Sequence, residues 1–301
     1  MKSIVLALLA LLLTPPISAR AASPLENYLA ARDAYIKKFT ALDESGKYDK
    51  RAHSDVQRAL GDLEKRLRGV VGPVAIPGFS AAGKINADTL VRSDIGFGSL
   101  DALVYTSQSG AKDKKSRVYV TTTALFDQWL KDHPDNWALA KSEVPKDMRE
   151  ALTLQTFYTF AISGDAAVDK YAELPVAKPA KAKSAFAMLA GISQDDAPII
   201  PGEIIVSVLD EASVFIATAP VAAKLDPIPA CQDVWSKAEQ AAEATREANP
   251  GDDPTFELWM QLRDEGVAAF HRCYAERAKG QPTFAAVVRQ AQALLERLPL
   301  K

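Results

Sequence analysis

The chain has 301 residues, of which 48% are apolar, and its 36 Lys and Arg against 38 Asp and Glu give a net charge of −2. This length and composition suffice for a full hydrophobic core in one or two domains. The charges are spread along the chain, so no concentrated basic face is available and we expect no nucleic-acid partner.

The first 21 residues have the pattern of a secretory signal peptide. Lys2 precedes an apolar run from Ile4 to Leu13, and small residues stand at Ala19 and Ala21, the positions that a signal peptidase reads. We therefore expect a mature chain that starts at Ala22 and a periplasmic or secreted protein. As a helix the apolar run is about 15 Å long, half of a bilayer core, which disfavours the alternative of an uncleaved membrane anchor.

The mature chain has the composition of a soluble protein. Removing the leader, with its two basic and no acidic residues, leaves 34 basic against 38 acidic residues and a net charge of about −4. No later segment reaches 18 consecutive apolar residues, so we expect no transmembrane segment in the mature chain.

Residues 22–70 are predicted to form an antiparallel helical hairpin. Apolar residues spaced by three, four and seven favour a first helix from Ser23 to Gly46, with Ser23 as N-cap and Pro24 at N1. A second helix is expected from Asp49 to Arg68, and Gly46 stands where the first helix needs a C-cap. Two heptads are too few to favour the alternative, a partner-binding coiled coil.

Residues 71–222 are predicted to form an antiparallel sheet. Glycine and proline between residues 69 and 98 indicate loops, after which segments rich in Val, Ile, Tyr and Thr indicate strands. Ser184–Ile192 is ambiguous between strand and helix, and we interpret it as a strand. A helix is expected over 124–132, and the remaining strands are expected at Leu100–Thr106, Arg117–Thr123, Gln155–Ile162, Glu203–Leu209 and Val214–Thr218.

Residues 223–301 are predicted to be helical, with a second hairpin joined by a disulfide. The turn at 249–254 places Asp253 as N-cap and Pro254 at N1 of the second helix. Helical periodicity places two sets of residues on the inner faces: Cys231, Trp235, Ala238, Ala242 and Thr245 on the first helix, and Phe256, Trp259, Leu262, Gly266, Phe270 and Cys273 on the second.

Cys231 and Cys273 are expected to form a structural disulfide. Each lies 18 residues from the turn, so arms of about 27 Å bring the two sulfurs to the same level of the hairpin. In an oxidising compartment such a pair forms a bond worth about 4 kcal/mol. The alternatives are two separate buried thiols and a redox-active pair; no C-x-x-C motif favours the latter.

Together these segments predict an α+β fold. An antiparallel sheet is flanked by an N-terminal helical hairpin and by a C-terminal hairpin with its disulfide, followed by a terminal helix.

The sequence contains no recognisable catalytic or metal motif. His53, His133 and His271 lie far apart and none stands in a metal-ligand spacing. The segment from Gly78 to Gly83 has one residue too many for a nucleophile elbow, and Ser109 to Lys112 matches S-x-x-K only within a polar loop. We assign no catalytic residue, cofactor or metal, and we do not expect an enzyme.

Two basic loops are the remaining candidate for ligand binding. If they converged, they would form a cationic surface for anionic envelope polymers or headgroups, although solvated loops are the simpler interpretation. The residues concerned are Lys112, Lys114, Lys115 and Arg117 in the first loop, and Lys178, Lys181 and Lys183 in the second.

The function expected from the sequence is that of an exported, soluble, non-catalytic binding or structural interaction module of the cell envelope. Its partner would be an envelope protein or an anionic envelope polymer. The alternatives are an envelope hydrolase whose site forms only in the fold, and a partner-dependent assembly or inhibitor protein.

Overall fold

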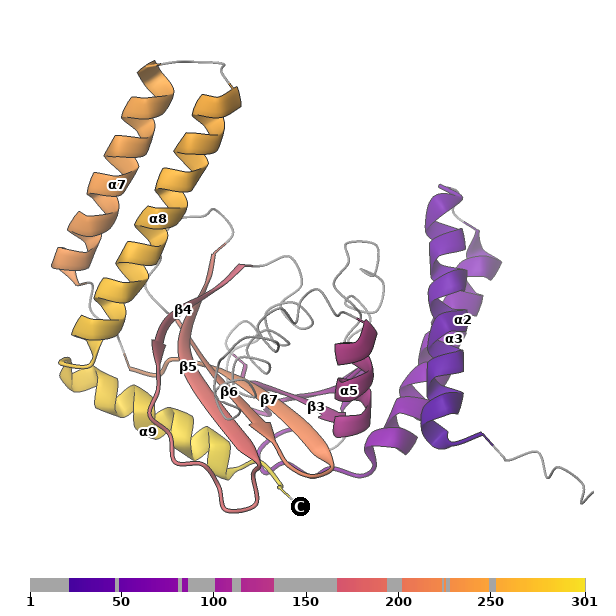
Figure 1. The fold of residues 1–301 in the computed structure, drawn as a ribbon. Helices are drawn as coiled ribbons and strands as arrows, with labels where there is room; N and C mark the ends of the chain where they lie inside the picture. Colours follow the sequence, from indigo (N-terminus) through magenta and orange to yellow (C-terminus); the bar gives the residue numbers. More distant parts are fainter. Residues whose placement is uncertain are drawn as a thin grey trace, which may run out of the picture.

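The computed structural model describes residues 22–46, 49–80, 83–85, 101–109, 115–132, 167–193, 202–223, 225, 228–248 and 253–300. They form a seven-stranded antiparallel sheet with a helical hairpin at each side and a helix along the sheet, as Figure 1 shows. This architecture confirms the predicted α+β fold.

The N-terminal hairpin consists of α2 (Pro24–Glu44) and α3 (Lys50–Val71). Ser23 caps α2 in a capping box: its backbone N–H donates to Glu26 Oε2 at 2.6 Å, and its hydroxyl accepts from the Glu26 N–H at 3.2 Å. Gly46 follows α2 with φ of 58°, and Asp49 caps α3. The predicted hairpin is confirmed, and α3 ends three residues later than expected.

A buried polar cluster fastens α2 to the sheet. The Tyr28 hydroxyl donates to Asp101 Oδ1 at 2.6 Å, and Arg32 Nε lies 3.3 Å from the same oxygen. The Thr121 hydroxyl donates to the Asp101 carbonyl at 2.6 Å. Tyr28 is fully buried and Asp101 nearly so, and burial beside that carboxylate raises the pKa of the Tyr28 hydroxyl well above its ordinary value.

The strands pair in the order β1-β2-β3-β7-β6-β5-β4, and every pair is antiparallel. Their bounds are Lys84–Ile85 (β1), Leu103–Thr106 (β2), Arg117–Thr122 (β3), Ala167–Glu173 (β4), Ser184–Ser193 (β5), Glu203–Leu209 (β6) and Ser213–Pro220 (β7). The helix α5 (Thr123–Asp132) follows β3 directly.

Both faces of the sheet are buried in its central strands. Val206 and Phe215 on one face and Ile205 and Ile216 on the other are all at most 1% exposed. This two-sided burial explains why the central strands are continuous apolar runs and do not alternate with polar residues.

Most of the predicted strands are confirmed. β2, β3, β6 and β7 lie within a few residues of their predicted positions, and the ambiguous segment at Ser184 is β5. β1 and β4 were not predicted. The expected strand Gln155–Ile162 lies outside the described residues.

The C-terminal helices are α7 (Pro229–Ala248), α8 (Asp253–Ala278) and α9 (Pro282–Glu296). Helix α8 packs beside β4, whereas the end of α7 and the start of α8 lie away from the sheet (Figure 1). Helix α9 packs on β6, and Gln290 hydrogen-bonds both the Pro220 carbonyl and the Ala222 N–H. Within the described part of the chain, none of the helices has the length and apolarity required to cross a membrane.

Candidate functional site

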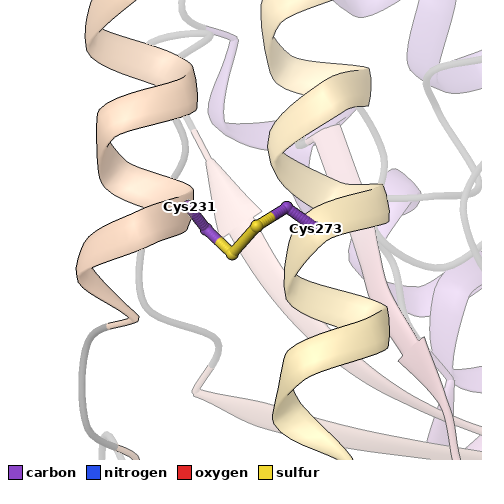
Figure 2. Close-up of a disulfide and its surroundings, with 2 residues drawn as sticks. All are labelled: Cys231 and Cys273. Carbon is purple, nitrogen blue, oxygen red and sulfur yellow. A yellow bond between two sulfur atoms is a disulfide. The ribbon is translucent and has the colours of Figure 1, made fainter.

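The disulfide between Cys231 and Cys273 joins α7 to α8 near the sheet, as predicted (Figure 2). The two sulfurs are 2.04 Å apart and the two Cα atoms 5.6 Å apart. Cys231 is fully buried. The bond excludes the alternative of two separate thiols and fixes the register of the hairpin at its base.

Close packing holds the hairpin together further along. A Cβ added at Gly266 would lie 2.5 Å from the Ala238 Cβ and 3.4 Å from the Trp235 ring, closer than packing allows. Gly266 therefore lets the backbone of α8 approach α7. Gly266 faces Ala238 just as Cys273 faces Cys231, so residues of α7 and α8 whose numbers add up to 504 lie at the same level.

Arginine and tryptophan side chains contact one another along the hairpin, beginning at Trp235, one turn from the disulfide. The Arg263 guanidinium of α8 lies 4.8 Å from the Trp259 ring centre and 5.8 Å from the Trp235 ring centre. The Arg246 guanidinium of α7 lies 5.2 Å from the Trp259 ring centre. Trp259 Nε1 donates to Glu243 Oε1 at 2.9 Å. Each cation–π contact contributes about 0.5–2 kcal/mol, so this cluster stiffens the hairpin from one turn beyond the disulfide to near the end of α7.

Three large apolar side chains are exposed at the start of α8: Phe256 (56% exposed), Leu258 (45%) and Met260 (38%). No other large apolar residue in the described ranges is comparably exposed. Phe256 and Met260 lie one turn apart on one flank of α8, whereas Leu258 lies on the other flank. We call Phe256 and Met260 the hairpin tip. The Phe256 ring stacks on Trp259, with centres 5.5 Å apart. The buried Trp259 thus packs against the inner side of the Phe256 ring, and the rest of the Phe256 side chain is exposed to solvent.

Phe256 was predicted to lie on the inner face of α8, and this prediction is wrong. Trp259, Gly266 and Phe270, predicted on the same face, are buried as expected. Phe256 lies at the same level of the hairpin as Ala248, because their numbers add up to 504. Ala248 is the last residue of α7, so α7 does not extend far enough to bury the Phe256 ring. Helical periodicity identifies a face, but it does not show where the partner helix stops.

The hairpin that carries the tip is acidic. α7 and α8 together have nine acidic and five basic residues. Glu257 and Asp264 lie exposed on the outer side of α8, and Glu247 is exposed near the end of α7. The tip is therefore an apolar surface bordered by negative charge.

The two basic loops lie at opposite ends of the sheet. Arg117 begins β3 and pairs with Thr218 at the far end of β7, whereas Ser184 begins β5 and pairs with Leu209 at the other end of β6. The described residues Lys115 and Arg117 thus do not share a surface with Lys178, Lys181 and Lys183. Lys112 and Lys114 lie outside the described residues, and anion binding by either loop alone stays a prediction.

A small polar group that sequence reasoning missed surrounds Glu203 on β6. The Thr218 hydroxyl hydrogen-bonds Glu203, and Arg117 lies nearby and hydrogen-bonds Tyr119. Burial raises the pKa of the Glu203 carboxyl and of the Tyr119 hydroxyl, while Thr218 and Arg117 oppose the shift at Glu203. The only sequence signal was an acidic residue at the start of an otherwise apolar strand.

Among the described residues, the remaining sequence candidates do not assemble into a reaction centre. His53 is exposed on α3, and Ser80 pairs through its backbone N–H with the Thr106 carbonyl, which is a structural role. The described residues include no cluster of three or more His, Cys, Asp or Glu side chains that could hold a metal. His133 is not among them.

Comparison of the chain with known protein families, with curated proteins and with solved structures finds no match.

Proposed function

We propose that this chain is an exported, non-catalytic interaction protein of the cell envelope, and that the hairpin tip is its contact surface. The observation that carries the proposal is the exposure of Phe256 and Met260 at the outer end of a braced hairpin. Apolar side chains gathered on a surface with a polar rim are typical of protein contact sites.

The bracing of the hairpin supports a binding role. The disulfide, the close approach at Gly266 and the Arg–Trp cluster order α7 and α8 before any partner arrives. A surface that is ordered beforehand loses less conformational entropy on association, and this favours affinity.

Two features support export. Disulfides form and persist in oxidising compartments such as the periplasm or the extracellular space, and Cys231 and Cys273 are bonded. Cleavage after residue 21 would also leave Ser23, the N-cap of α2, in the mature chain. The leader pattern and the first helix are thus compatible with each other.

A capture experiment tests the tip as a contact surface. The mature protein is immobilised and exposed to envelope extract, beside the double variant Phe256→Asp, Met260→Asp and a control, Arg272→Ser, which changes an exposed residue of the same helix nearer the sheet. We expect a protein retained by the wild type and the control, lost with the tip variant, and displaced by free mature protein.

Equal capture by all three proteins, or no displaceable capture at all, would contradict the proposal. Thermal melting and a thiol assay on each variant establish that the fold and the disulfide are intact.

A further inference from the structure

The N-terminal hairpin carries an open groove on the opposite side of the molecule from the hairpin tip. Two adjoining cavities of about 340 and 550 Å³ lie between α2 and α3 and share Lys38 and Asp55 in their walls. They extend from Ala31 to Ser45 along α2, which is about 21 Å of helix. We call these two cavities the groove.

The chemistry of the groove changes along its length. Near the turn of the hairpin the walls are mainly apolar, with Ala41, Leu42, Ala52 and Val56. Toward the sheet, Arg58 and Arg66 join the rim, where each contacts an acidic neighbour on α3, Asp55 at 3.0 Å and Asp62 at 2.7 Å. Exposed pairs of this kind are weak, so both arginines can turn to another carboxylate.

The hairpin tip matches the apolar half of this groove. Phe256 and Met260 are one turn apart on α8 and form an exposed apolar row about 6 Å long. The exposed Glu257 and Asp264 lie next to this row on the outer side of α8. Leu258 lies about 160° around the helix from Met260, on the other flank.

The charges of the two hairpins are of opposite sign. α2 and α3 together have nine basic and seven acidic residues, whereas α7 and α8 have five basic and nine acidic residues. Opposite potentials on two surfaces favour their encounter and fix their orientation. The groove itself is lined by three basic residues, Lys38, Arg58 and Arg66, and three acidic residues, Asp49, Asp55 and Asp62. Apolar anchors spaced by one helical turn fit its apolar half, and their acidic neighbours can pair with the three basic residues.

We infer that the occupant of the groove is the hairpin tip of a second copy of this chain. The two hairpins of one molecule lie at opposite sides of the sheet, so a chain does not fill its own groove (Figure 1). Phe256 and Met260 enter the apolar half of the groove, and Glu257 and Asp264 meet Lys38, Arg58 and Arg66. The inference rests on the proposed function in one respect, the hairpin tip as the contact surface.

The contact joins two different surfaces, the tip of one copy and the groove of another. Two copies that make the contact reciprocally form a symmetric dimer, whereas copies joined head to tail form a ring or an open chain. Because tip and groove are separate surfaces, each can be altered alone, and this property separates the inference from a dimer in which one surface contacts its own copy, from a different protein partner and from a membrane.

Sedimentation velocity on the purified mature chain tests the inference. Two variants are required: a tip variant, Phe256→Asp with Met260→Asp, and a groove variant, Lys38→Glu with Ala41→Glu, which changes exposed residues of α2 only. We expect the wild type to associate with rising concentration, more weakly at high salt, and each variant alone to associate at least about 30-fold more weakly.

Mixing the two variants gives the sharpest result. The intact groove of the tip variant receives the intact tip of the groove variant, so the mixture should form a complex of two chains and nothing larger. Leu258→Asp is the matched control: it changes an equally apolar exposed residue on the other flank and should leave association unchanged.

A wild type that stays monomeric at all concentrations, a mixture without a complex, or loss of association in Leu258→Asp would each overturn the inference. If the capture experiment then still depends on Phe256 and retains a different protein, the proposed function stands and only the second copy as partner is wrong. If the tip variant behaves like the wild type in both the capture experiment and sedimentation velocity, both proposals fail.

Discussion

Removing the disulfide should destabilise the protein without abolishing its fold. The bridge closes a loop between positions 42 residues apart, and the chain-entropy relation gives about 4 kcal/mol at 25 °C for that length. Residual order in the unfolded chain lowers this value, so we expect Cys231→Ala with Cys273→Ala to reduce the free energy of unfolding by about 2–4 kcal/mol.

Urea unfolding followed by tryptophan fluorescence measures the effect. Two of the four tryptophans, Trp235 and Trp259, lie in the hairpin and report on it directly. For a slope of about 3 kcal/mol/M, a loss of about 3 kcal/mol lowers the midpoint by about 1 M. Ser236→Ala with Arg272→Ala changes exposed residues of the same two helices and should leave the midpoint unchanged.

An unchanged midpoint in the cysteine variant would refute the reasoning, because the loop would then not be constrained by the bridge. Loss of the strand signal in circular dichroism before urea is added would also refute it, since most of the residues that form the hydrophobic core lie outside α7 and α8.

Three further predictions concern buried contacts. Gly266→Ala should lower the thermal midpoint, because the new methyl would lie 2.5 Å from the Ala238 Cβ and overpacking costs about 1–3 kcal/mol; an unchanged midpoint would contradict the close approach. Tyr28→Phe removes a donor 2.6 Å from Asp101 and should cost about 1–3 kcal/mol in urea unfolding, and a neutral result would mean that the bond is not formed. Burial raises the pKa of Tyr274 from 10.0 to about 12, so the unfolded chain loses this proton first as the pH rises and the contribution to stability is lost from pH 10 upward. Tyr274→Phe should flatten that alkaline fall in stability, and an equally steep fall in the variant would contradict the burial argument.

Local signals predicted both ends of α2 and the start of α3, whereas α3 ends three residues later than expected and Asp253, predicted as the N-cap of α8, is its first residue. Ser23 with Pro24, Gly46 and Asp49 act through hydrogen bonds and backbone angles within a few residues, so the sequence around each site is sufficient. The cysteine register was predictable for a similar reason, because two equal helical arms from one turn determine which residues meet.

Features that depend on distant contacts could not be predicted in the same way. The β4 segment Ala167–Glu173 has little apolar periodicity. It forms a strand because its backbone pairs with β5. The buried setting of Glu203 and the exposure of Phe256 likewise depend on which elements cover them. The groove between α2 and α3 forms only when the two helices pack together, so the sequence of either helix alone does not predict it.

Crosslinking in intact cells tests the central claim, that the hairpin tip is the contact surface, most directly. A photo-crosslinking phenylalanine analogue replaces Phe256 and, as a control, Arg272, which is exposed on the same helix beyond Gly266 from the tip. We expect illumination to produce a discrete adduct of the exported chain from position 256 and none from position 272. The absence of an adduct from position 256, or the same adducts from both positions, would contradict the account.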